Sequence, residues 1–165
     1  NSDLANNFGN LCQRVTAFAI KNCKSKVPEN IKFNKEDLII LDKYKNNIQN
    51  IRTKIDNQDV NFYIDYIVNS LFEANKYFND QEPWNKKKDP IRLNTIVFTT
   101  LEVVRKISYL LYPVIPETSL KALKIFNIQE KDIIYSSIEK NDILKKGMNI
   151  NQIDILFKKI QKKND

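Results

Sequence analysis

Apolar residues recur every three or four positions along most of the chain, which is the spacing of one face of an α-helix. Positions 60–78 show it most regularly, with Val60, Ile64, Ile67, Leu71, Ala74 and Phe78 spaced four, three, four, three and four apart. The segment 129–148 has no clear period, and we expect ordered loop there with a short extended piece at 133–135. The pattern predicts an all-α protein.

Capping residues and prolines set the ends of the predicted helices. Asn34 with Asp37 three residues later forms a capping box, and Asp89 before Pro90 is an N-cap followed by a proline at the first helical position. Pro83 ends another helix, because a proline forces the preceding residue out of the helical conformation. The predicted helices cover 2–24, 35–56, 59–81, 90–112, 116–126 and 152–162.

The helix at 90–112 is apolar around most of its circumference, and such a helix is predicted to be the central one. Its single polar line consists of Arg92, Thr95, Thr99, Glu102, Lys106 and Tyr109. We therefore predict an antiparallel helix bundle at 1–128. Residues 129–165 are predicted to form a C-terminal extension that packs on the bundle and ends in an appended helix.

The charge of the chain favours a polyanionic partner. Its 165 residues include 27 Lys+Arg and 20 Asp+Glu, which gives a net charge of +7 and an isoelectric point near 9.3. No apolar run approaches the ~18 residues that a membrane span requires, so we expect a cytoplasmic chain with no membrane partner.

The sequence contains no histidine and only two glycines. This removes the usual acid–base group, most zinc sites and any glycine-rich phosphate loop. We therefore predict no catalytic residue, no metal and no cofactor in this chain. It is expected to be part of a larger protein that carries the catalysis.

The stretch 72–90 contains the only tryptophan, Trp84, where two predicted helices meet. It directly follows Pro83 and lies beside a positive cluster formed by Lys86, Lys87 and Lys88. An exposed aromatic ring next to lysines indicates a nucleic-acid contact. Two alternatives stay open, because the ring could instead fill the gap between the helices and the lysines could simply be solvated.

Asn10 and Arg14 lie one turn apart on the same line of the first predicted helix. Both side chains could therefore reach one group. The alternatives are a solvated Asn10 and an Arg14 that pairs with Asp3 or with a carboxylate of another helix.

Three stretches carry a resemblance to a known family: NNFGNLCQR at 6–14, ANKYFNDQEPW at 74–84 and LLYPVIPET at 110–118. They resemble the first helix, the end of the third helix and a later turn of the anticodon-binding domain of methionyl-tRNA synthetase, a class I aminoacyl-tRNA synthetase. The resemblance covers essentially the whole chain. Asn151, Gln152 and Lys159 depart from the family's closing segment, which puts the docking of the tail in doubt.

The resemblance implies a role for individual residues. Asn10 and Arg14 match the residues that hydrogen-bond the first anticodon base, the cytosine of CAU. Trp84 matches the ring that stacks on this base, and Pro83 matches the proline that positions the ring. We add the hypothesis that phosphates of the stem-loop are contacted by Lys86, Lys87 and Lys88.

The resemblance also implies the partners, which are the anticodon stem-loop of methionine tRNA and a catalytic domain of the same chain. The full-length enzyme would be a methionine–tRNA ligase that uses ATP and methionine. The family's nucleotide-binding motifs are missing from these residues, so the fragment itself should be inactive. Two other functions remain open: the bundle of another class I synthetase and a helical protein-interaction module.

Overall fold

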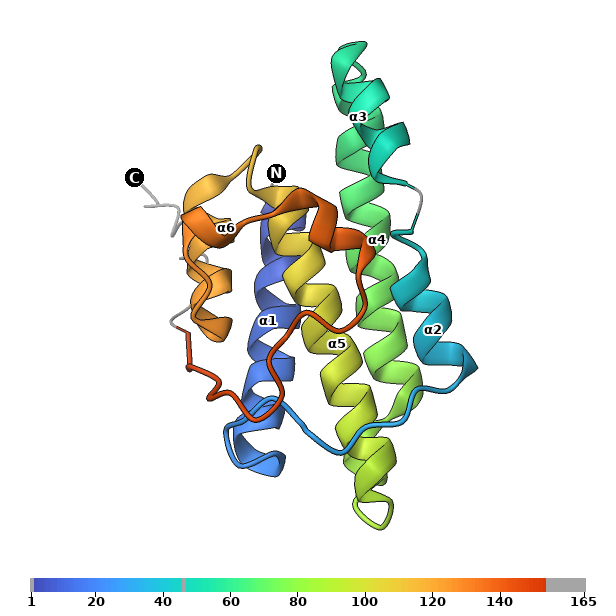
Figure 1. Cartoon of the computed structure of the whole chain (residues 1–165), viewed down its shortest axis with the longest axis vertical. Helices are drawn as coiled ribbons and strands as arrows, with labels where there is room; N and C mark the ends of the chain where they lie inside the picture. The colour runs from blue at the N-terminus through green and yellow to red at the C-terminus, as the bar shows by residue number, and fades with distance from the viewer. Residues whose placement is uncertain (1, 46, 154–165) are drawn as a thin grey trace, which may run out of the picture.

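The structure, a computed structural model, describes residues 2–45 and 47–153 (Figure 1). Its α-helices are α1 (Ser2–Asn22), α2 (Lys35–Asp42), α3 (Ile48–Asp56), α4 (Val60–Gln81), α5 (Pro90–Leu111) and α6 (Pro116–Leu123). Short 3₁₀ helices lie at η1 (Pro83–Asn85), η2 (Lys124–Phe126), η3 (Glu130–Asp132) and η4 (Tyr135–Glu139). The described part contains no β-strand, so the all-α prediction is confirmed.

Helix α5 lies at the centre of the bundle, as predicted. α1 and α4 run in one direction, and α5 runs back between them in the opposite direction (Figure 1). α5 also packs against α2 and α6. Almost every side chain from Leu93 to Leu111 is buried. The antiparallel bundle is therefore confirmed, with its core on all sides of α5.

The predicted helix 35–56 is wrong as one element, because the chain breaks it at 43–47. The side-chain Nδ2 of Asn47 donates to the carbonyl oxygen of Lys43, the group that would accept the backbone N–H of residue 47 in a continuous helix. Tyr44 is buried at the break and packs edge-on against Tyr66. α3 therefore continues in a new direction and packs on α4 (Figure 1).

The predicted caps are present. The backbone N–H of Asn34 donates to the Asp37 carboxylate (2.8 Å), and the Asn34 side chain accepts from the Asp37 N–H (3.1 Å). Asp89 accepts from the backbone N–H of Arg92 at 3.0 Å, as predicted, and Asp59, for which no cap was predicted, accepts from that of Phe62 at 3.1 Å. Val60 was expected in the core but is 61% exposed, because the first turn of α4 extends past the ends of α1 and α5 (Figure 1).

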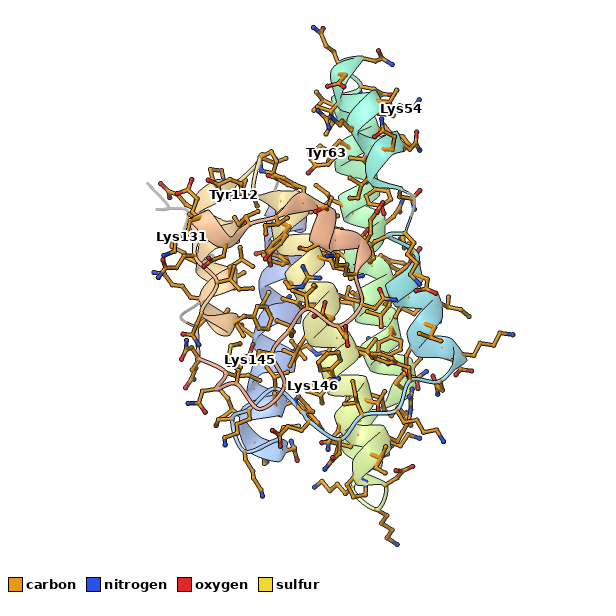
Figure 2. The ribbon with its side chains drawn as sticks, in the orientation of Figure 1. Lys54, Tyr63, Tyr112, Lys131, Lys145 and Lys146 are labelled. Carbon is orange, nitrogen blue, oxygen red and sulfur yellow. The ribbon has the colours of Figure 1, made fainter. Side chains whose placement is uncertain are left out.

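Tyrosine hydroxyls hold the end of the bundle that lies opposite the α4–α5 loop (Figure 2). Tyr63 donates to the carbonyl oxygen of Leu110, and Tyr112 donates to the carboxylate of Glu130. Burial raises the pKa of Tyr63 far above its usual value, so this hydroxyl keeps its proton. This end is thereby fixed independently of the loop that carries Trp84.

The segment after α6 crosses back over the bundle (Figure 1). The extended piece predicted at 133–135 is only partly correct. Ile133 and Ile134 have extended backbone angles but pair with no strand in the described residues. Of the predicted helix 152–162, residues 152 and 153 are not helical, and the rest lies outside the described residues.

The polar line of α5 is buried from Thr95 onward, and its charged residues Glu102 and Lys106 hold this returning segment. The Lys106 ammonium donates to the backbone oxygen of Leu41 (3.2 Å) and to Oδ1 of Asn141 (2.8 Å). It also lies 5.1 Å from the centre of the Tyr44 ring. Burial lowers the pKa of Lys106 to about 8, although the negative charge of Glu102 opposes this shift.

Lys106 should make the protein more stable as the pH rises above 8. An unburied lysine titrates near 10.5, so between these two values the unfolded chain binds a proton that the folded chain has released. The free energy of unfolding then rises by at most about 1.4 kcal/mol per pH unit. The substitution Lys106→Met removes this contribution. Urea denaturation of both proteins measures it as a stability difference that changes with pH.

The two cysteine thiols change the stability of the protein in the opposite direction as the pH rises. Burial raises the pKa of Cys23 to about 11 and that of Cys12 further, so the unfolded thiols ionise first and stability falls at high pH. This fall is common to the wild type and the Lys106→Met variant. The difference between the two proteins therefore isolates Lys106, and a constant difference across the window would contradict the prediction.

Candidate nucleic-acid interface

The loop between α4 and α5 presents Trp84 on a tightly bonded turn. Glu82 adopts a left-handed conformation (φ 46°) that ends α4, and the buried Pro83 begins η1 directly after it. Backbone hydrogen bonds run from Asn85 to Glu82 (2.9 Å), from Lys86 to Pro83 (3.1 Å) and from Asp89 to Lys86 (2.9 Å). A left-handed non-glycine residue is costly, and it persists only where the surrounding structure fixes it. The position of Trp84 is therefore set by its backbone.

A chain of aromatic contacts joins Trp84 to α1. The ring is 40% exposed and meets Phe78 edge-on, with the ring centres 6.0 Å apart. Phe78 in turn packs edge-on against Phe18 of α1, also at 6.0 Å. The guanidinium of Arg14 lies 5.4 Å from the centre of the Phe78 ring. Phe78 thus holds the exposed ring and the guanidinium beside each other.

Arg14 also has a polar partner on α4. Its Nη2 donates to Oδ1 of Asn79 at 2.5 Å. This partner is a neutral amide, and no ion pair joins Arg14 to a carboxylate of another helix within the described residues. The side chain of Asp3, the other partner considered, lies outside the described part of the structure. Arg14 keeps its positive charge at the surface with donors left over.

A shallow pocket of about 290 Å³ opens between Trp84 and α1. Its lining consists of Arg14, Ala17, Phe18, Lys21, Asn22, Phe78 and Trp84. Aromatic rings form one side, and polar side chains of a single helix form the other. This arrangement can hold a flat ring against Trp84 while its edge faces hydrogen-bonding groups.

The structure brings together three of the four residues expected to bind the anticodon. Arg14 and Trp84 line the pocket, and Pro83 lies buried under the loop. Asn10 is exposed one turn before Arg14 and is absent from the described lining. Their roles in binding stay predictions.

The three lysines expected to contact phosphates lie on the same loop. Lys86 is half-buried, and Lys87 and Lys88 are exposed. None of the ion pairs found in the described residues involves them. Their ammonium groups remain accessible to an anion.

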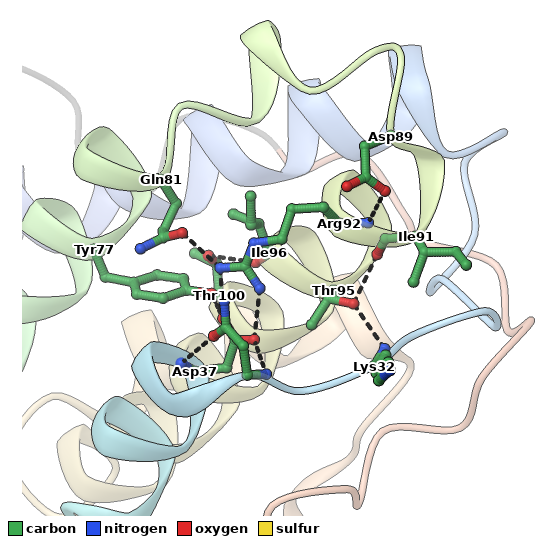
Figure 3. Close-up of polar contacts among 11 residues, drawn as sticks. Lys32, Asp37, Tyr77, Gln81, Asp89, Ile91, Arg92, Thr95, Ile96 and Thr100 are labelled. Atoms are coloured by element: carbon green, nitrogen blue, oxygen red, sulfur yellow. Dashed lines mark hydrogen bonds and ion pairs between the residues drawn. The ribbon is translucent and has the colours of Figure 1, made fainter.

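An ion pair anchors both ends of the Trp84 loop (Figure 3). Arg92, in the first turn of α5, donates to both carboxylate oxygens of Asp37 at 2.7 and 3.0 Å, and its Nη2 also donates to Gln81 at 2.5 Å. Gln81 is the last residue of α4, so one guanidinium joins the helix before the loop to the helix after it.

Asp37 is fully buried and has further partners (Figure 3). Its carboxylate accepts from the Tyr77 hydroxyl and from the backbone N–H of Asn34. Burial, followed by this hydrogen bond to Asp37, raises the pKa of Tyr77 well above its usual value. The buried Asp37 carboxylate is therefore paired with a cation, and its oxygens accept further hydrogen bonds. Both conditions are needed for a charged group to be buried without a large loss of stability.

The sequence did not reveal all of these residues. Phe78 was assigned to the apolar stripe of its helix, and it also forms the pocket wall together with Phe18. The Asn79 partner of Arg14 and the far wall at Lys21 and Asn22 were missed, because no local pattern marks a contact between α1 and α4.

The fold and the site together define a helical domain suited to single-stranded RNA. An exposed ring, an adjacent guanidinium and a lysine-bearing loop are the groups that bind an unstacked base and its backbone.

Comparisons with known proteins identify the family. A model of the anticodon binding domain of methionyl tRNA ligase matches residues 27–165. A methionine–tRNA ligase of Brucella suis is 38% identical over 129 residues, which cover 78% of this chain and 25% of that protein. One from Rickettsia conorii is 32% identical over 165 residues, covering 98% of this chain and 32% of that protein. The chain belongs to the family of anticodon-binding domains of methionyl-tRNA ligases.

Solved structures agree with this assignment. The free form of Mycobacterium tuberculosis methionyl-tRNA synthetase superposes with a TM-score of 0.88 at 30% identity, over 98% of this chain and 33% of that chain. Its complex with methionyl-adenylate gives a TM-score of 0.85. The expected family and fold are confirmed, and the two alternative functions gain no support.

The chain spans between a quarter and a third of the length of these relatives. It therefore corresponds to one portion of each of these relatives. Within the described residues, no helix is both long and apolar enough to cross a membrane.

Proposed function

We propose that this chain recognises the anticodon stem-loop of methionine tRNA. The observation that carries the proposal is that Arg14 and Trp84 line one pocket, with Phe78 in contact with both. Trp84 offers a stacking surface to any base, whereas Arg14 offers donors to a base edge. Trp84 therefore supplies affinity for the first anticodon base, the cytosine of CAU, and Arg14 supplies discrimination.

The neighbouring residues complete the interface. Asn10 contacts the same nucleotide from the turn before Arg14, about 6 Å along the helix. Pro83 fixes the backbone that presents the ring. Phosphates of the stem-loop are contacted by Lys86, Lys87 and Lys88. The exposure of Lys87 and Lys88 and the lack of ion pairs at all three within the described residues support this role.

The chain acts within a longer polypeptide, a cytoplasmic methionine–tRNA ligase that uses ATP and methionine. The lengths of the relatives support this, as does the M. tuberculosis protein solved with methionyl-adenylate. Residues 129–165 form an extension of the 1–128 bundle that faces the catalytic domain. Contacts of Ser137 and Asn141 with α5 support its packing on the bundle.

Replacing Trp84 with alanine should weaken binding of a CAU stem-loop by about 5- to 150-fold, because one base–aromatic stack is lost. Arg14→Ala should reduce the preference for CAU over loops with another first base. Fluorescence anisotropy of labelled stem-loops, titrated with the wild type and each variant, measures both effects. The half-exposed ring predicts little change in folding stability for Trp84→Ala.

The matched control is a triple variant in which Lys86, Lys87 and Lys88 become glutamine. Loss of phosphate contacts should lower the affinity for all stem-loops alike and flatten its dependence on salt. Equal binding of every loop by the wild type would refute the proposed function, as would unchanged binding by both Trp84→Ala and Arg14→Ala.

A further inference from the structure

The pocket beside Trp84 continues past Arg14 to the last turn of α1. Lys21 and Asn22 form this far wall. Asn22 is half-buried and is the last residue of the helix. It lies about 12 Å from Arg14 along the helix axis, so the two residues line the pocket at its two ends along α1.

One hydrogen bond fixes the orientation of the Asn22 amide. Its Nδ2 donates to the backbone oxygen of Phe18 at 2.9 Å. A carbonyl oxygen can only accept, so the NH₂ group must be the part of the amide that faces it. Within the described residues no group donates to Asn22 Oδ1. The amide therefore offers an acceptor of fixed identity at this wall.

The two ends of the pocket offer complementary chemistry. Arg14 provides only donors, and Asn22 Oδ1 provides only an acceptor. Cytosine carries an exocyclic N4 amino donor, together with ring acceptors, whereas uracil has the acceptor O4 in place of the amino group. A cytosine stacked on Trp84 can satisfy both ends, but uracil would set O4 against Oδ1.

We propose that Asn22 is a further specificity-determining residue, whose Oδ1 accepts a hydrogen bond from the exocyclic amino group of the base stacked on Trp84. This inference rests on the proposed function and adds the group that separates cytosine from uracil. Asn10 cannot supply this acceptor, because it is absent from the described lining and lies about 18 Å from Asn22 along α1.

A purely structural role for Asn22 makes a different prediction. In that case only its bond to the Phe18 carbonyl matters, and any replacement that loses the bond has the same effect. Leucine and aspartate both lose it, since neither can donate there. Aspartate alone keeps an acceptor, and a carboxylate accepts well from the cytosine amino group. The two variants therefore separate base recognition from helix capping.

The experiment measures the affinities of CAU and UAU stem-loops for the wild type, Asn22→Leu and Asn22→Asp. Asn22→Leu should reduce the CAU-to-UAU preference by about tenfold, through weaker CAU binding. Asn22→Asp should keep this preference, with lower affinity for both loops because its charge repels phosphate. Lys21→Gln is the control, since removing one positive charge from the same wall weakens attraction to the RNA backbone and lowers both affinities equally.

Each other outcome overturns the inference. An unchanged preference in Asn22→Leu shows that Oδ1 does not face the base, and an equal loss in both Asn22 variants shows that only the helix end matters. Circular dichroism melting confirms that each variant is folded. Trp84→Ala, titrated in parallel, tests the proposed function separately. If Trp84→Ala weakens binding while Asn22→Leu keeps the preference, only the inference about Asn22 fails.

Discussion

Replacing Arg92 with leucine should lower the free energy of unfolding by about 3–5 kcal/mol, because a fully buried carboxylate loses its cationic partner. Arg92 supplies both charged hydrogen bonds to Asp37, at 2.7 and 3.0 Å. Tyr77 and a backbone N–H would remain, but neither carries a charge. Urea denaturation followed by circular dichroism measures the loss.

The same substitution should disturb the site. Arg92 also bonds Gln81, the residue at which α4 ends, so its loss releases both ends of the loop that carries Trp84. Because Trp84 is the only tryptophan, its fluorescence reports on this loop alone. We expect altered emission and weaker stem-loop binding in the folded variant.

A double variant tests the cause. Asp37→Asn combined with Arg92→Leu removes the buried charge along with its partner, so it should be more stable than Arg92→Leu alone. The free energies of unfolding of Asp37→Asn, Arg92→Leu and the double variant are compared. If the double variant is destabilised by the sum of the two single losses, then lost packing, and not an unpaired charge, explains the destabilisation.

The helices could be predicted from the sequence wherever local chemistry decides the structure. The capping box at Asn34 and the cap at Asp89 act within three residues, so their residue types alone reveal them. The break at 43–47 depends on Tyr44 entering the core and Asn47 turning back on the chain. Helical periodicity continues across the break and therefore conceals it.

The residues of the candidate site also fall into two groups, those that a local motif reveals and those that only helix packing brings together. Pro83, Trp84 and Arg14 stand in recognisable motifs. The structure places Trp84 and Arg14 at one pocket and buries Pro83 under the loop that carries Trp84. The bond from Arg14 to Asn79 joins residues 65 positions apart, and the far wall at Asn22 exists only because α1 packs beside the loop. Such contacts follow from helix packing, which a single sequence does not specify.

Buried charges on α5 explain how one helix can organise two regions. At its first turn, Arg92 fixes the Trp84 loop. Three turns further on, Glu102 and Arg105 are fully buried and hold the segment that returns over the bundle. Arg105 donates to Glu102 at 2.9 and 3.0 Å, and to Ser137 at 3.0 and 3.1 Å. The second carboxylate oxygen of Glu102 accepts from the backbone N–H of Leu144.

Arg105→Met should therefore detach the returning segment and lower the free energy of unfolding by about 3–5 kcal/mol, since Glu102 is left as a buried charge without its cation. Lys140 and Lys145 are already exposed, so local opening should make the backbone after them cleavable by trypsin before the bundle itself is cut, and mass spectrometry of the early fragments detects this. Arg52→Met is the matched control, because Arg52 is exposed and its loss should change stability by less than about 0.5 kcal/mol. Equal stability and equal cleavage of the two variants would show that the Glu102–Arg105 pair does not hold the segment in place.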